Sequence, residues 1–257
     1  MTRRILALIG VGVLGGFLSG TFGIGGGILM VPLLIWLIKL DQRHAAALSL
    51  AAVLPAAIVG AVTYGFELHV DYIAGALVAA GGIVGALIGT RLLRRLPLGW
   101  LRWMFVVLLV LVAVRMLIVV PETDASIDIT VWSVIALIGL GLLVGIASGL
   151  FGIGGGVIIV PALVGLFGVS ELIAKGTSLL AMIPTSVTGT ISNARARLVS
   201  PLDGFILGVA AALAAYPGVV VAHLMPTLVS HILFAVLVLF AATQLAIRAW
   251  RMRKQEN

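Results

Sequence analysis

The chain has 257 residues, of which 62% are hydrophobic and only 10% are charged, and its mean hydropathy is +1.28. Soluble domains carry about a quarter charged residues, so this composition excludes a soluble enzyme. Cysteine is absent, which excludes disulfides and thiolate-bound metals. In such an apolar chain the net charge of +7 is an orientation signal, and we expect no nucleic-acid partner and no cofactor.

The apolar residues fall into eight blocks, which in chain order are 5–40, 44–64, 71–93, 100–120, 130–169, 172–193, 202–223 and 230–250. One crossing takes roughly 20 apolar residues, so the chain has room for about eight to ten transmembrane helices and no separate globular domain. The blocks 5–40 and 130–169 would each exceed about 50 Å as one helix, whereas the bilayer core is about 30 Å thick. Each must break at the glycine run in its middle, where helix propensity is lowest, so we predict two helical hairpins.

Two stretches of the chain are nearly identical. Gly-Thr-Phe-Gly-Ile-Gly-Gly-Gly begins at Gly20 and returns as Gly-Leu-Phe-Gly-Ile-Gly-Gly-Gly from Gly149, and Val-Pro follows both. The same offset of 129 residues superposes Ser49 on Ser178 without a gap. The chain therefore reads as a duplicated half, with a first repeat at 1–120, a periplasmic linker at 121–129, a second repeat at 130–250 and a cytoplasmic tail at 251–257.

Lysine and arginine indicate how the two halves face. If both hairpins fold back and the N-terminus is cytoplasmic, every basic residue except Arg115 and Lys175 falls at a cytoplasmic end. If each hairpin block crossed the membrane once, one half would place its basic clusters on the wrong face. We therefore predict an all-α polytopic membrane protein of two inverted-topology repeats, each a glycine-broken hairpin plus three transmembrane helices, with both termini cytoplasmic. A cleaved signal peptide at 1–20 is the alternative for the first segment, but its equivalent recurs inside the chain.

The glycine turns are the predicted substrate site. A helix that stops inside a membrane leaves peptide groups unpaired, which is tolerable only where they face protein, a cavity or a ligand. Free N–H groups at a helix start favour an anion, and glycines let it approach. Two tips that enter from opposite faces should meet near the midplane. The predicted binding glycines are Gly23, Gly25, Gly26, Gly27, Gly152, Gly154, Gly155 and Gly156.

Other readings of these glycines are weaker. Close helix packing is the structural alternative, although a matched pair of motifs favours a site. A nucleotide-binding loop is a poor fit because no Lys-Ser or Lys-Thr follows the glycines and no strand precedes them.

The segment 172–193 is unusually polar for a spanning helix, and its hydroxyl groups are candidates to line an anion path. The candidate lining residues are Ser49, Thr177, Ser178, Thr185, Ser192 and Asn193, and the candidate hinges are Pro32, Pro55, Pro161 and Pro184. Hydroxyls that bond back to their own helix are the alternative for each Ser and Thr. Lys175 is a candidate to attract the anion, against the alternative of a pair with Glu171 at the membrane surface. The four histidines lie near predicted helix ends without metal-ligand spacing.

The paired Gly-x-Phe-Gly-Ile-Gly-Gly-Gly motifs with Val-Pro, together with the segments at 176–178 and 184–185, resemble the sulfite exporter TauE/SafE family, the four-transmembrane-spanner sulfur-anion permeases. The resemblance covers essentially the whole chain. It implies carriage of sulfite, thiosulfate, sulfoacetate or related sulfur-containing anions across the bacterial inner membrane.

We therefore expect a secondary transporter that works by alternating access between the two hairpin tips. An anion channel, or a transporter of a different small organic anion, is the alternative. An intramembrane enzyme is disfavoured because the sequence offers no nucleophile with a base and no metal set. The lipid bilayer and the anion are the expected partners, and the oligomeric state is left open.

Overall fold

The computed structural model describes residues 2–97 and 129–226, together with scattered residues between 100 and 110 and between 228 and 247. In the continuous parts every regular element is a helix: α1 (Thr2–Phe22), α2 (Gly27–Leu37), α3 (Gln42–Phe66), α4 (Tyr72–Arg95), α6 (Val131–Phe151), α7 (Gly156–Phe167), α8 (Glu171–Arg195) and α9 (Pro201–Leu224). The expected helices at 100–120 and 230–250, the linker and the tail fall largely or wholly outside the described residues.

Five of the described helices are long and apolar enough to cross a membrane: α1, α3, α4, α6 and α9. Helix α8 matches α3 in length at 25 residues but is more polar, since it carries Glu171, Lys175, Arg195 and several hydroxyl groups. Helices α2 and α7 have 11 and 12 residues, so each is only about 16–18 Å long and too short to cross a bilayer core of about 30 Å. The protein is thus an all-helical, multi-pass membrane protein.

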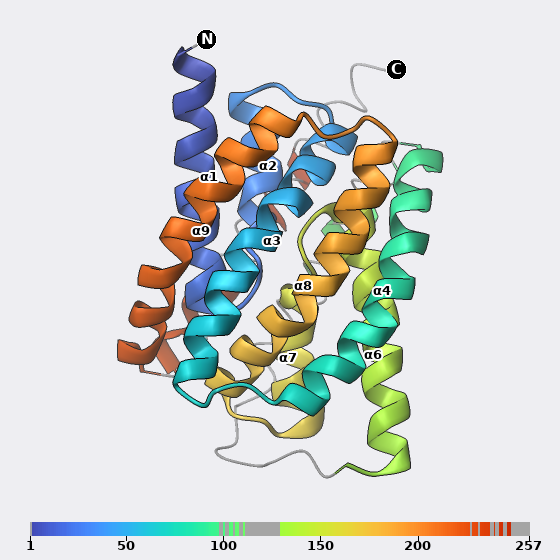
Figure 1. Cartoon of the computed structure of the whole chain (residues 1–257), viewed down its shortest axis with the longest axis vertical. Coiled ribbons are helices and arrows are strands. Elements are labelled where there is room, and N and C mark those ends of the chain that lie inside the picture. Colours follow the sequence, from blue (N-terminus) through green and yellow to red (C-terminus); the bar gives the residue numbers. More distant parts are fainter. Residues whose placement is uncertain are drawn as a thin grey trace.

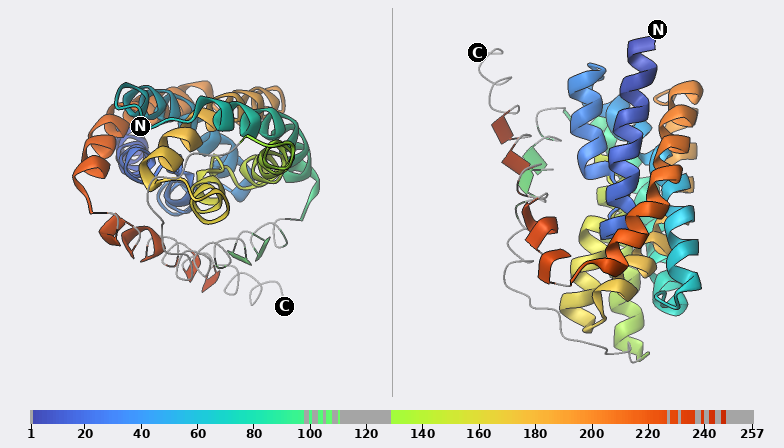
Figure 2. Two further views of the ribbon diagram at one scale, coloured as in Figure 1. Left: turned by 90° about the horizontal axis from the view of Figure 1, so that it is seen from below. Right: turned by 90° about the vertical axis from the view of Figure 1, so that its left-hand side faces the viewer.

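The helices form two layers (Figures 1 and 2). Helices α9, α3, α8 and α4 lie side by side in one layer, and the hairpin helices α1, α2, α6 and α7 lie behind it. Helix α1 begins at the upper end of the bundle in Figure 1 and α2 returns to that end, whereas α6 begins at the lower end and α7 returns there. The two hairpins therefore enter the bundle from opposite ends.

Small residues allow the hairpins to pack closely on the front layer. Glycines recur every fourth position along α4 and α6, and a Cβ at Gly81 or Gly145 would overlap a backbone carbonyl of the facing helix. The same holds between α1 and α9, where a Cβ at Gly16 or Gly20 would overlap α9 backbone. Close backbone approach without side chains is the usual basis of helix association in lipid. For these glycines, close packing is the role that the structure gives.

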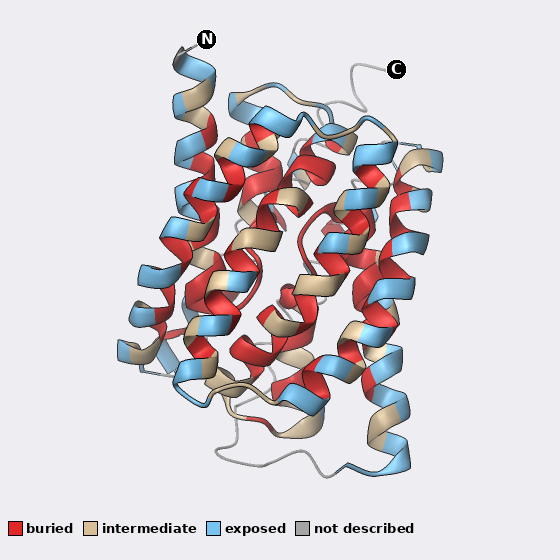
Figure 3. Ribbon diagram, viewed as in Figure 1, coloured by how far each residue is buried: buried red, intermediate tan, exposed pale blue. Residues whose placement is uncertain are grey.

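The helix starts fall into two classes. Helices α3, α4, α6, α8 and α9 begin at an Asp, Ser or Thr whose side chain accepts a hydrogen bond from the first turn, namely Asp41, Asp71, Thr130, Ser170 and Ser200. Helices α2 and α7 instead follow a glycine and have no side-chain cap. Both of these uncapped starts lie in the buried interior (Figure 3).

Candidate functional site

Each hairpin turns at glycines that adopt a backbone conformation unfavourable for other residues. The φ angles of Gly25 and Gly26 are +76° and +70°, and those of Gly154 and Gly155 are +80° and +97°. A side chain is rarely tolerated in this left-handed region, so the sequence requires glycine at these points. Gly23 and Gly152, at +68° and +70°, end the incoming helices in the same way, and residues 23–27 and 152–156 are all buried.

The two turns touch each other. A Cβ at Gly27 would overlap the carbonyl oxygen of Gly152, and a Cβ at Gly156 would overlap the carbonyl oxygen of Gly23. All eight predicted binding glycines therefore lie in two turns that pack directly against one another inside the bundle.

The turns carry a set of peptide N–H groups without acceptors. Among the hydrogen bonds between described residues, none uses an N–H of residues 24–28 or 153–157. The first helical bonds come later, from Leu29 and Met30 to Gly26 O and from Ile158 and Ile159 to Gly155 O. Unpaired N–H groups at the positive end of a helix dipole are suited to binding an anion. The two turns bring two such sets together.

Ser49 and Ser178 hold the turns in place. Ser49 Oγ donates to Gly152 O over 2.8 Å, and Ser178 Oγ donates to Gly23 O over 2.9 Å. Both serines are fully buried. Each hydroxyl thus satisfies a buried carbonyl at the end of a hairpin's first helix, which is otherwise costly to leave unpaired.

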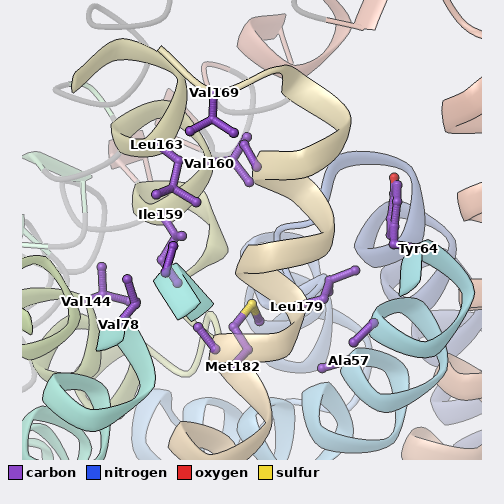
Figure 4. Close-up of a cluster of buried hydrophobic side chains, with 14 of the residues drawn as sticks. Ala57, Tyr64, Val78, Val144, Ile159, Val160, Leu163, Val169, Leu179 and Met182 are labelled. Atoms are coloured by element: carbon purple, nitrogen blue, oxygen red, sulfur yellow. The ribbon is translucent and has the colours of Figure 1, made fainter. Parts of the chain in front are cut away.

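Sequence reasoning missed the side chains of Val53 and Met182. A Cβ at either Gly25 or Gly154 would overlap Met182 Cε, and it would lie 3.1 Å or 2.8 Å, respectively, from Val53 Cγ1. Met182 projects from α8 into the buried apolar cluster shown in Figure 4. The two residues share the offset of 129 and lie four positions after the two serines, so they occupy equivalent places beside the turns.

The other polar candidates lie apart from the turns. Thr177 Oγ1 accepts from the Asp71 N–H at 2.8 Å and so fixes the loop between α3 and α4. Thr185 Oγ1 donates to Ala181 O of its own helix at 2.9 Å, which is the structural alternative stated for it. Ser192 pairs with Thr90 of α4 at 2.8 Å.

Asn193 is fully buried, and its amide has no partner among the described residues. Pro32, Pro55, Pro161 and Pro184 each lie within a continuous helix.

Lys175 and Glu171 form an ion pair of 2.8 Å, as the simpler alternative expected, and both side chains are buried within the protein. The Lys175 side chain is only 2% exposed because the end of α1 covers it, with its ammonium 5.9 Å from the centre of the Phe22 ring. Its Nζ also donates to Ser230 Oγ at 2.9 Å. The pair is therefore a buried one beside the first turn.

Two histidines meet across the chain near the same end of the bundle. His69 Nδ1 lies 3.3 Å from His223 Nε2. Partial burial and the neighbouring His223 hold the pKa of His69 below its ordinary value. Within the described ranges no group of three His, Asp or Glu side chains could hold a metal ion. His231 and Arg115 lie outside the described residues.

A groove of about 410 Å³ runs between α4 and α8. Its lining is apolar and comprises Gly75, Ala76, Ala79, Ala80, Ile83, Leu180, Ile183 and Pro184. Such a surface offers no donor to an anion, so the glycine turns are the better candidate site.

Known proteins match the chain over most of its length. A sequence model of the sulfite exporter TauE/SafE family matches residues 1–116 and 137–257. A probable membrane transporter protein of Xylella fastidiosa (strain 9a5c) is 31% identical over 201 residues, which are 77% of each chain. The probable membrane transporter protein YunE of Bacillus subtilis is 26% identical over 210 residues, 72% of this chain and 77% of its own. No solved structure matches. The chain therefore belongs to the sulfite exporter TauE/SafE family of membrane transporters.

Proposed function

We propose that the protein is a secondary transporter of a small sulfur-containing anion, such as sulfite, thiosulfate or an organosulfonate, and that the two glycine turns bind it. The observation that carries this proposal is the pair of uncapped helix starts. Helices α2 and α7 are the described helices with a glycine N-cap and no side-chain cap, and both begin in the buried interior where the hairpins touch. Donors that are not used by the fold are available to an anion.

The proposed mechanism is alternating access between two inverted repeats. The entry of the hairpins from opposite ends supports it (Figure 1), as does the repetition of contacts such as Ser49 to Gly152 and Ser178 to Gly23. Rocking of one repeat against the other would open the turns to each side in succession, with the prolines inside α2, α3, α7 and α8 as hinges.

Charge supports an orientation with both termini in the cytoplasm of a bacterium. At the end of the bundle where α1 begins lie Arg3, Arg4, Lys39, Arg43, Arg91, Arg94, Arg95, Arg195 and Arg197. At the opposite end lie Glu67, Asp71 and Glu171. This asymmetry follows the positive-inside rule for the inner membrane.

In this proposal the peptide amides bind the anion and the hydroxyl groups have a secondary part. Ser49 and Ser178 position the turns through their carbonyls. Thr177 and Ser192 bond to groups elsewhere, so the binding of the anion does not depend on them.

Uptake into proteoliposomes tests the function. The purified protein is reconstituted, and uptake of sulfite, thiosulfate, sulfoacetate, taurine and acetate is followed separately. We expect saturable uptake of at least one sulfur-containing anion, which the other sulfur anions inhibit and acetate does not. Flux that rises linearly with concentration would indicate a channel instead, and preference for acetate would indicate a carboxylate transporter.

Substitution of the turn glycines tests the site. Gly25→Ala and Gly154→Ala each place a Cβ against Met182 Cε and put a residue with a side chain at a positive φ. We expect each to lower the free energy of unfolding by about 1–3 kcal/mol. We expect uptake to fall about tenfold or more in both. Gly10→Ala and Gly139→Ala are matched controls, because these glycines share the same offset and their added Cβ meets nothing within 4 Å. Turn variants that fold and transport at the control rate would rule the site out.

A further inference from the structure

The buried pair of Glu171 and Lys175 has a counterpart in the other half of the chain that carries no charge. Lys175 lies against the first turn, since a Cβ at Gly23 would be 2.6 Å from Lys175 Cα. Ala46 lies against the second turn in the same way, with its Cα 2.5 Å from a Cβ at Gly152. We call the first arrangement the charged corner (Gly23, Glu171, Lys175, Ser178) and the second the neutral corner (Gly152, Gln42, Ala46, Ser49).

The neutral corner shows that a glycine turn of the same geometry packs against its helix without an ion pair. Gln42 occupies the position of Glu171 and Ala46 that of Lys175, yet Ser49 makes the same bond to its turn as Ser178 does. Removing two charges from water costs free energy that their mutual attraction rarely exceeds. Ionisable groups inside a membrane protein that packing does not require are functional candidates.

The two oxygens of the Glu171 carboxylate have different surroundings. One carboxylate oxygen, Oε1, accepts from Lys175 and from Ser230, whereas Oε2 is buried with no partner among the described residues. The titratable and charged groups facing this region from the packed elements are Tyr64 of α3, Glu67, His69 and Asp71 of the following loop, and His223 of α9.

Most of these neighbours have partners of their own. Tyr64 donates to Gly20 O, Asp71 caps α4, and the two histidines lie against each other. Glu171 is thus the carboxylate that shares the buried ammonium.

We propose that Glu171 binds a co-transported proton and that Lys175, freed from its ion pair by that proton, then binds the anion. This inference rests on the proposed function. A proton from the aqueous side binds the Glu171 carboxylate and makes it a neutral acid. The ammonium of Lys175 stays charged, loses its counter-ion and attracts the incoming anion beside Phe22 and the first turn. One proton and one negative charge enter together, so the charge of the corner is unchanged by loading with a monoanion.

The test uses thiosulfate and methanesulfonate, whose charges do not change near neutral pH, so that pH acts on the protein alone. Uptake into proteoliposomes is compared with and without an acidic pH on the side that holds the anion. For the wild-type protein we expect the gradient to raise the initial rate at least about fivefold and the lumen to acidify during uptake. Absence of stimulation in a protein that does transport would overturn the proton site alone. Absence of uptake in every variant would instead contradict the proposed function.

Two variants locate the effect. Glu171→Gln should still transport both probes down their gradient, but with equal rates with and without the pH gradient. The double variant Glu171→Gln with Lys175→Ala copies the neutral corner, so it should fold, and it should lose the stimulation and bind the anion more weakly. His69→Gln is the control for histidine titration and should keep the full stimulation. Retention of the gradient effect in Glu171→Gln, or its loss in His69→Gln, would overturn the proposal.

Discussion

The charged and the neutral corner perform the same structural task with different chemistry. In both, one residue of the helix, Ala46 or Lys175, lies against a glycine of positive φ. The serine three positions later donates a hydrogen bond to the carbonyl oxygen of that glycine. They differ in the first turn of the helix, which carries Gln42 and Ala46 in the neutral corner and Glu171 and Lys175 in the charged one. The comparison separates what the hairpin needs in order to fold from what has been added to one half.

The largest expected effect comes from breaking the charged pair on one side only. Lys175→Ala leaves the Glu171 carboxylate buried without its cation, so it should lower the free energy of unfolding by about 3–5 kcal/mol. The double variant with Glu171→Gln should cost much less, because it recreates the neutral corner. Denaturant unfolding in detergent measures both. A single variant as stable as the double one would show that the carboxylate is not effectively buried.

A smaller effect tests the equivalence of the serines. Ser49→Ala and Ser178→Ala each leave a buried turn carbonyl without its donor, which should cost about 1–3 kcal/mol in either half. Thermal unfolding of both variants, measured side by side, checks this. The expected result is two similar losses, and a loss confined to one half would show that the other turn is held by different contacts.

The smallest effect distinguishes the helix starts. Asp41 caps α3 in the neutral corner and Ser170 caps α8 in the charged one, and replacing either by Ala should cost about 1 kcal/mol. Burial tends to raise the pKa of Asp41, but hydrogen bonds from His44 and Arg43 lower it overall. Its folded-state pKa is therefore below the unfolded value, so its contribution is present above the ordinary aspartate pKa and disappears as the pH falls through the lowered one.

Acid titration of stability separates the two caps. The penalty of Asp41→Ala should shrink in strong acid, while that of Ser170→Ala should not change with pH. Equal pH profiles would mean that the carboxylate charge of Asp41 does not contribute to the cap.

Much of the hairpin architecture follows from local rules. A block of about 36–40 apolar residues exceeds the bilayer, and a run of glycines gives it one place to break. The structure places helix ends at Phe22 and Phe151 and new starts at Gly27 and Gly156, within those runs. The glycines of α4 and α6 have a different role, because they allow two helices to pack closely. In the sequence, only their spacing of four residues distinguishes them from the glycines of the hairpin turns.

The side chains around the turns were harder to predict. The sequence places Ser178, Thr185 and Ser192 on one face of α8, yet the first bonds to a turn, the second to its own helix and the third to α4. A 25-residue helix passes several neighbours along its length, so one face does not mean one environment. Met182 and Val53 were missed because an apolar residue carries no chemical signal of a site.

The sequence by itself determined the membrane class, the repeated glycine motif and the points where the hairpins break, because hydropathy and glycine propensity act over neighbouring residues and a repeated motif can be read directly from the chain. Only the tertiary structure decided that the two turns touch, that two serines are committed to their carbonyls and that Lys175 is buried with Glu171. Each of these depends on residues more than 50 positions apart along the chain or on the covering of one helix end by another, which local pattern does not encode.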